Sequence, residues 1–285
     1  MYESYFLGRL TMEEGKYFNI NTMLKNLFDA LDQSFESKRP NLVFYFSKNV
    51  PCQMKGEVST LYIVLFKTLK QLIKNQCTSE ILLSVDAPEE FIYKEDVTFK
   101  ISNIPIKKEK IIPELEAQLN ADLERMDATL EYKDESGGSL VITLPLVTAE
   151  LGCRRHYRMP SKTMLDKNIL LVIEGNTLAL SLMKMFKYFP MNIDLCLKSF
   201  KEEKYDLTQY DMVLVEDVLF NYDLQQRIQK AQEKSDVKFV MLGYTDVYDE
   251  DDSSKLHTAF LDKPVTQESV FKLLISLFDE LPILT

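Results

Sequence analysis

Three short apolar runs in the second half of the chain constrain its fold more than any other feature of the sequence. They cover residues 168–173, 211–215 and 238–242. Continuous apolar runs of this length are typical of strands that are buried on both faces of a parallel sheet. An apolar-rich helical pattern at 178–189 and a second helix at 224–234 separate them, so this half predicts strands that alternate with helices.

Two shorter strand patterns, at 193–197 and 259–261, and a last amphipathic helix that Thr266 can cap complete the second half. Strictly alternating strands and helices predict a five-stranded parallel sheet with helices on both faces, which is a doubly wound α/β fold. The Met and Phe stripe of the helix at 178–189 is interpreted as core rather than as a cofactor site.

The first half has a different order of elements. A stripe of leucines with Ile73 marks a long helix at 56–76, for which Ser59 or Thr60 is the expected cap. The predicted helices are at 20–33, 56–76 and 114–126, the last with Pro113 at its start. The predicted strands are at 42–46, 81–85 and 97–101, and a hairpin at 128–145 ends the half. The order along the chain is thus helix, strand, helix, strand, strand, helix and hairpin. This order resembles that of a family named below, and the resemblance implies a mixed sheet backed by helices on one face.

Length and composition limit the functional class. A chain of 285 residues is long enough for two domains, and we divide it into 1–150, a basic linker at 151–166, and 167–285. The net charge of −10 argues against broad nucleic-acid binding, because phosphate contacts need a cationic surface.

The sequence has neither an apolar run of membrane-spanning length nor a signal pattern at its start, which predicts a cytoplasmic protein without membrane contact. Its 4 cysteines are widely separated, which predicts reduced thiols.

The first half resembles the ATP-binding domain of sensor histidine kinases over most of residues 17–147. The resemblance rests on the order of elements, on Gly56-Glu57 ahead of the long helix and on the last strand pattern. In that family two asparagines four residues apart on the helix line the ATP cleft, and the second helps to hold Mg²⁺. Lys67 and Gln71 stand at the matching positions, and Lys74 lies on the same helix face.

Other positions of this half also differ from the family's pattern. Asn103 stands where the family has the aspartate that contacts adenine, and residues 111–120 lack the glycines of the lid over the phosphates. Neither His156 nor His257 lies on a long dimerising helix of the kind that carries the family's phospho-acceptor. The resemblance therefore implies no catalytic residue, no metal and no cofactor, and we expect a pseudokinase rather than an enzyme.

The second half resembles the receiver domain of response regulators over about residues 167–280. Lys263-Pro264 at the end of the fifth strand matches the family's Lys-Pro, in which the lysine neutralises a phosphoaspartate and the peptide bond is cis. The two acidic residues that hold Mg²⁺ in the family correspond to Ile173 and Glu174 here, and Gly243 stands at the position of the serine or threonine that senses phosphate. With one acidic ligand lost, we do not expect Mg²⁺-dependent phosphotransfer.

The phospho-acceptor position of this resemblance is ambiguous by one residue. Counting from Tyr210 puts Glu216 there, and counting back from the loop at 217–221 puts Asp217 there; we favour Glu216. A glutamate at this position could mimic a phosphorylated aspartate near Lys263. The alternative, which we prefer, is a salt bridge from Glu216 or Asp217 to Lys263 without a switch.

Together the resemblances imply a catalytically inactive two-component signalling protein, in which a histidine-kinase-type ATPase α/β sandwich precedes a CheY-like doubly wound sheet. We expect it to act in a bacterial pathway by binding a histidine kinase or a response regulator, through surfaces near 178–187 and 260–274. The sequence does not decide whether the chain forms a homodimer. Two alternatives are a phosphorelay receiver that is phosphorylated at Asp217, and a nucleotide or other anion held by Lys67 and Lys74 without catalysis.

Overall fold

The computed structural model of the chain divides into two compact units, Met1–His156 and Tyr157–Thr285. It describes residues 17–35, 42–47, 49–75, 80–89, 93–104, 108–134, 137–148, 162–198, 205–244 and 258–279. Both histidines and most of the predicted linker at 151–166 lie outside these residues. Each unit is described by itself.

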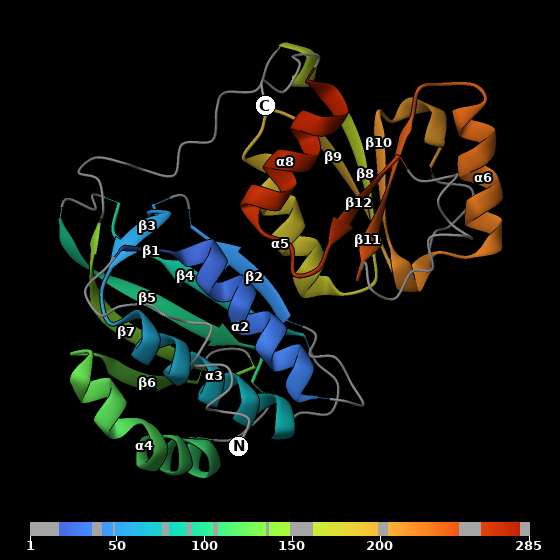
Figure 1. Cartoon of the computed structure of the whole chain (residues 1–285). Helices are drawn as coiled ribbons and strands as arrows, with labels where there is room; N and C mark the ends of the chain where they lie inside the picture. Colours follow the sequence, from blue (N-terminus) through green and yellow to red (C-terminus); the bar gives the residue numbers. More distant parts are fainter. Residues whose placement is uncertain are drawn as a thin grey trace. The chain divides into compact units, whose positions relative to one another are not determined.

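The first unit is built on a mixed β-sheet (Figure 1). Its described strands lie in the order β1-β3-β7-β5-β4-β2, and β6 pairs with β7 beside this path. Strand β2 runs parallel to β4 and the other pairs are antiparallel. The strands are β1 (Tyr17–Asn19), β2 (Leu42–Phe46), β3 (Gln53–Lys55), β4 (Ile81–Asp86), β5 (Lys94–Ser102), β6 (Thr129–Lys133) and β7 (Ser139–Thr148).

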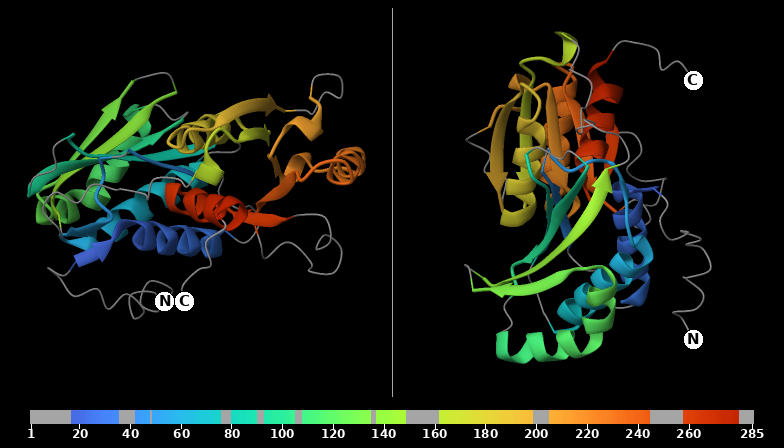
Figure 2. Two further views of the ribbon diagram at one scale, coloured as in Figure 1. Left: turned by 90° about the horizontal axis from the view of Figure 1, so that it is seen from above. Right: turned by 90° about the vertical axis from the view of Figure 1, so that its left-hand side faces the viewer.

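Three helices lie on one side of this sheet, as Figures 1 and 2 show. They are α2 (Ile20–Ser34), α3 (Val58–Asn75) and α4 (Lys108–Arg125). The sheet turns apolar residues such as Phe99 and its cross-strand neighbour Ile142 toward the core, where both are fully buried. Threonines fill the next register position, where the hydroxyls of Thr98 and Thr143 lie 3.4 Å apart. This alternation of apolar and polar residues is what a sheet with one covered face requires.

Several predicted boundaries in this unit were wrong. Helix α4 begins at Lys108 rather than at residue 114, so Pro113 lies inside the helix instead of starting it. Ile111, upstream of the proline, is buried together with Leu115, and this packing extends the helix through a residue that lacks one amide donor. Helix α3 begins at Val58, so Ser59 is part of its first turn and not its cap.

The three-residue strands β1 and β3 were not predicted. They pair with each other, and β3 also joins the end of β7 through Met54 and Lys55. Strands this short contain too few alternating residues to leave a periodic pattern in the sequence. The long strands and helices of the unit were predicted, because each carries a complete apolar face.

The second unit is a five-stranded sheet in which all described pairs are parallel. Its order is β9-β8-β10-β11-β12, so the first strand of the unit lies between the second and the third. The strands are β8 (Asn168–Ile173), β9 (Asn192–Leu197), β10 (Met212–Glu216), β11 (Lys238–Gly243) and β12 (Ala259–Asp262). This arrangement confirms the predicted CheY-like doubly wound fold.

Helices cover both faces of this sheet. In Figure 1, α5 (Asn176–Lys187) and α8 (Gln267–Phe278) lie on one face and α6 (Tyr222–Gln232) on the other. The short 3₁₀ helices η1 (Lys162–Met164), η2 (Leu207–Gln209) and η3 (Asp217–Leu219) complete the described elements. As predicted, Thr266 caps α8: its hydroxyl accepts from the Ser269 N–H at 3.2 Å, and the Ser269 hydroxyl accepts from the Thr266 N–H at 2.9 Å.

Two further expectations concern the described residues only. None of the helices in the ranges given above combines the length and the apolar character that a membrane crossing needs. Cys52 and Cys196, the cysteines that fall within those ranges, are not joined in a disulfide bond.

The hairpin between β6 and β7 provides a test of the fold of the first unit. Gly137 and Gly138 both have positive φ, at 93° and 69°. A Cβ on Gly138 would lie 2.6 Å from the Ile104 carbonyl oxygen and 2.7 Å from the Tyr132 hydroxyl, whereas a Cβ on Gly137 would meet nothing closer than 3.8 Å.

We therefore expect Gly138→Ala to lower the free energy of unfolding by about 1–2 kcal/mol more than Gly137→Ala. Both variants bear the backbone cost of positive φ, and only Gly138→Ala adds the steric clash. Denaturant unfolding followed by circular dichroism measures the difference. Equal destabilisation of the two variants would contradict this packing of the hairpin.

Candidate functional site

A group of charged residues lies at the carboxyl ends of the parallel strands in the second unit. Glu174 follows β8, Glu216 ends β10 with Asp217 directly after it, Gly243 ends β11, and Lys263 follows β12. The carboxyl ends of parallel strands are where ligands bind in doubly wound folds. The topology thus brings together residues that are up to 89 positions apart in the chain, from Glu174 to Lys263.

The centre of this group is an ion pair between Lys263 and Glu216. The Lys263 Nζ lies 2.7 Å from Glu216 Oε1, and the side chains are only 10% and 6% exposed. The backbone N–H of Glu174 donates to the other oxygen of Glu216, Oε2, at 2.8 Å. Both carboxylate oxygens of Glu216 therefore have a donor, so neither is buried without a hydrogen-bond partner.

Asp217 is the second carboxylate near Lys263. Its Oδ1 lies 3.6 Å from Lys263 Nζ and accepts from the Val218 N–H at 2.8 Å. Gly243 makes room for it, because a Cβ at that position would lie 2.8 Å from Asp217 Oδ2 and 3.1 Å from its Cβ and Cγ. A side chain at position 243 would thus displace the Asp217 carboxylate.

Two further contacts hold Lys263. Its backbone N–H donates to the Gly243 carbonyl at 2.8 Å, and its ammonium lies 5.6 Å from the centre of the Tyr244 ring. The peptide bond that joins Lys263 to Pro264 is cis. Among the described residues, no group of three or more His, Cys, Asp or Glu side chains is arranged to bind a metal ion.

The predicted cleft residues of the first unit lie on α3 and at the end of β5. Lys67 Nζ forms an ion pair with Asp122 Oδ2 of α4 at 3.0 Å, with side chains that are 35% and 29% exposed. Gln71 lies one turn further along α3 and is half-buried, and Lys74 is exposed near its end. Lys67 thus has an acidic partner on the neighbouring helix.

A second ion pair joins the same two helices. Arg125 of α4 lies 3.3 Å from Glu57, the residue that precedes α3. Asn103, at the position of the family's adenine-binding aspartate, has a φ of 64° and donates its side-chain amide to the Glu80 carbonyl at 3.1 Å. Its amide therefore stabilises the turn after β5 in this structure.

Sequence reasoning named the members of both sites but missed the groups that complete them. The Glu174 backbone amide, the Tyr244 ring and Asp122 all contact predicted site residues, and no sequence motif marks any of them. A backbone donor cannot be read from a side-chain pattern. Asp122 could be found only by knowing which turn of α4 lies beside Lys67.

Comparisons with known proteins give matches at the level of structure. No model of a known protein family and no curated protein matches this chain. The crystal structure of full-length ShkA, a hybrid histidine kinase, in complex with AMPPNP matches with a TM-score of 0.66 and 12% sequence identity, over 97% of this chain and 60% of that chain.

Two further matches each cover less than half of this chain. The ATP binding domain of PrrB from Mycobacterium tuberculosis covers 48% of this chain and 100% of its own, at 13% identity and a TM-score of 0.36. A CheY-like receiver domain from Methylobacillus flagellatus covers 39% of this chain and 98% of its own, at 16% identity and a TM-score of 0.35.

This chain therefore has the architecture of a histidine-kinase ATPase domain followed by a receiver domain. It spans 60% of the length of ShkA.

The expectation that the chain is not an enzyme but a pseudokinase is contradicted by these matches. ShkA shares the fold across both units, and its crystal structure is that of a complex with AMPPNP. The expectation relied on the identity of a few residues, such as those at positions 67, 71 and 103. A nucleotide is held by the whole surface of a cleft, so the loss of individual motif residues does not establish that the chemistry is lost.

The buried ion pair of the second unit gives a direct prediction. Lys263→Met leaves the Glu216 carboxylate buried without its cation, and we expect it to lower the free energy of unfolding by about 3–5 kcal/mol. The double variant Lys263→Met with Glu216→Met removes both charges and should recover most of that loss.

Denaturant unfolding of the full chain measures both variants. Lys272→Met is the matched control, because Lys272 pairs with Glu268 at the surface with 72% of its side chain exposed, and its effect should stay within about 0.5 kcal/mol. A Lys263→Met variant as stable as this control would contradict the buried pair.

Proposed function

We propose that this chain is a two-component signalling protein that works by binding a histidine kinase through its receiver-like unit. The observation that carries the proposal is the ion pair of Lys263 with Glu216, whose carboxylate also accepts the Glu174 amide. At the carboxyl edge of the sheet these groups therefore bind one another. The unit is therefore held in one state, and it can present a fixed surface to a partner.

Helix α5 supplies a surface of the right kind. Leu180 is 58% exposed and Tyr188, which follows the helix, is 40% exposed. Lys184 and Lys187 are exposed on the same helix, and residues 176–187 contain no acidic side chain, although the chain as a whole carries a net charge of −10. An apolar and basic helix face of this kind fits an amphipathic helix that carries acidic residues.

The partner that we propose is such a helix of a histidine kinase. In that case Leu180→Glu should weaken binding at least about tenfold, because it puts a charge into the apolar part of the contact. Tyr222→Glu is the matched control: Tyr222 is 71% exposed at the start of α6, on the opposite face of the sheet.

Biolayer interferometry with the purified histidine kinases of the source cell, one at a time, measures the effect. The proposal requires at least one kinase that binds the unmodified chain, loses affinity for Leu180→Glu and keeps it for Tyr222→Glu. If none of them binds, or if both variants weaken binding equally, the proposal is wrong.

A second candidate function is adenine-nucleotide binding by the first unit. It is favoured by the match to ShkA, which holds AMPPNP and shares its fold with 97% of this chain. Lys67 is the cation on α3 that could contact phosphate oxygens, and Asp122 competes for it at 3.0 Å.

Calorimetry with AMPPNP tests this candidate. Lys67→Met should weaken binding, whereas Asp122→Asn should strengthen it about two- to fivefold, because it frees the ammonium from an exposed ion pair. Arg125→Gln is the control, because it breaks the other α3–α4 ion pair and should leave the affinity unchanged. No heat at millimolar AMPPNP, or equal effects of all three variants, would exclude this site.

A further inference from the structure

In receiver domains the carboxyl edge of the sheet holds Mg²⁺, and the residues at this edge of the second unit do not fit that ion. Mg²⁺ needs an octahedral set of oxygen ligands at about 2.1 Å. Ile173, at the position of one of the family's two acidic residues, has a fully buried apolar side chain. Glu174, at the other position, is exposed, and it is its backbone N–H that contacts Glu216. The end of β8 therefore lacks one of the carboxylates that the ion needs.

The two carboxylates at the end of β10 already share a cation. Lys263 Nζ lies 2.7 Å from Glu216 Oε1 and 3.6 Å from Asp217 Oδ1. The second oxygen of Glu216 accepts from the Glu174 N–H at 2.8 Å, and Asp217 Oδ1 also accepts from the Val218 N–H at 2.8 Å. Three of the four carboxylate oxygens thus have a donor of the chain, and both carboxylates contact one ammonium group.

The surroundings of Lys263 hold this ammonium in place. Its side chain is only 10% exposed, and its backbone N–H donates to the Gly243 carbonyl at 2.8 Å. The ammonium also lies 5.6 Å from the centre of the Tyr244 ring. A divalent ion bound to either carboxylate would lie beside this ammonium, and two positive charges at so short a distance repel each other strongly where little water screens them.

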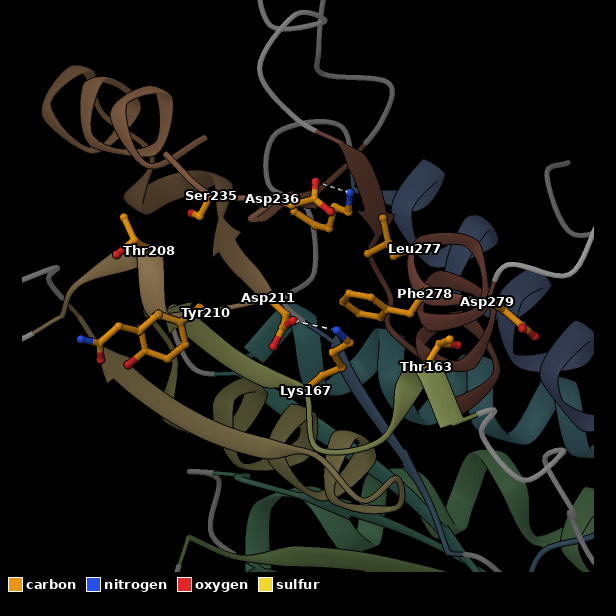
Figure 3. A pocket seen from close by; sticks show the side chains of 12 residues that line it. Thr163, Lys167, Thr208, Tyr210, Asp211, Ser235, Asp236, Leu277, Phe278 and Asp279 are labelled. Carbon is orange, nitrogen blue, oxygen red and sulfur yellow. Dashed lines mark hydrogen bonds and ion pairs between the residues drawn. The ribbon is translucent and has the colours of Figure 1, made fainter. Parts of the chain in front are cut away.

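A lysine at the opposite end of the sheet has a different setting. In a pocket at the amino ends of the strands, Lys167 Nζ lies 2.8 Å from Asp211 Oδ1 (Figure 3). The second oxygen of Asp211 accepts from the Asn168 N–H at 2.9 Å, as Glu216 does from a backbone amide. The side chains of this pair are 29% and 32% exposed, so water screens it. The Lys263 pair differs from it in its burial and in the second carboxylate beside it.

We propose that Lys263 is the resident cation of this edge and takes the place that a divalent metal ion has in receiver domains. Glu216 and Asp217 then bind such an ion only when the ammonium is removed. The chain therefore keeps the carboxyl edge of its second unit in one state whatever the concentration of Mg²⁺. This inference goes beyond the partner binding proposed above and does not depend on it, because metal binding and kinase binding are measured separately.

Electron paramagnetic resonance of Mn²⁺ added to the full chain tests the proposal, because Mn²⁺ takes the same oxygen ligands as Mg²⁺ and its free form is counted directly. The variant is Lys263→Gln, whose amide can still donate to Glu216 but carries no charge. It should bind one Mn²⁺ at least about tenfold more tightly than the unmodified chain, as the loss of a positive charge about 4 Å away predicts. Lys272→Gln is the matched control: it removes the same charge from a side chain that is 72% exposed, and it should bind Mn²⁺ as the unmodified chain does.

A second substitution locates the ion. Asp217→Asn added to Lys263→Gln should abolish the gained binding. Equal Mn²⁺ binding by Lys263→Gln and Lys272→Gln would overturn the proposal. One Mn²⁺ that the unmodified chain binds and Asp217→Asn loses would also overturn it, and this comparison decides the question even if thermal unfolding shows that Lys263→Gln does not fold.

Discussion

The ion pair between Lys263 and Glu216 links four strands of the parallel sheet at the end where a receiver-type fold places its site. Glu216 ends β10, its second oxygen is bound by the amide that follows β8, and Lys263 follows β12 and bonds through its own N–H to the last residue of β11. Two buried charges are costly to bring out of water unless every oxygen and proton finds a partner. Here Lys263 binds one oxygen of Glu216 and the Glu174 amide binds the other. The carboxyl ends of the strands are therefore joined to one another by side chains and backbone groups of the chain.

In the first unit, too, a lysine is paired with a carboxylate of the chain, but this ion pair is partly exposed. Lys67 on α3 forms an ion pair with Asp122 of α4. This pair is about a third exposed, so it is screened by solvent and contributes little to stability. An ion pair of this strength can open for a ligand that carries more charge. The two ion pairs thus differ in kind: the one in the second unit is buried, and the one in the first unit is partly exposed and can exchange.

The fold could be predicted from the sequence because its signal is repeated along the chain. The three central strands of the second unit, β8, β10 and β11, are continuous apolar runs, and in β8 the five residues Ile169, Leu170, Leu171, Val172 and Ile173 are all fully buried. The start of α4 and the strands β1 and β3 could not be predicted in this way. A proline inside a helix and strands of three residues are decided by tertiary packing, which leaves no local period.

The residues of the second unit's site were also named from the sequence, and the salt bridge that we preferred, from Glu216 or Asp217 to Lys263, is present in the structure. The sequence left open whether Glu216 or Asp217 faces Lys263, and the structure places both carboxylates near it, at 2.7 Å and 3.6 Å. The backbone amide of Glu174 and the acidic partner of Lys67 had no signal in the sequence. The inference of a pseudokinase failed for a related reason, since it drew a conclusion about a whole cleft from a few motif positions, the missing glycines at 111–120 and the lack of a histidine on a dimerising helix.

The most direct test of the central claim is whether the carboxyl edge of the second unit accepts a phosphoryl group. The chain is incubated with acetyl phosphate and Mg²⁺ and its intact mass is measured, with Asp217→Asn as the companion variant. If the Lys263–Glu216 pair holds the site, the mass stays unchanged in both proteins. A phosphoryl group that is gained by the unmodified chain and lost in Asp217→Asn would contradict the account, because Asp217 would then take Lys263 from Glu216.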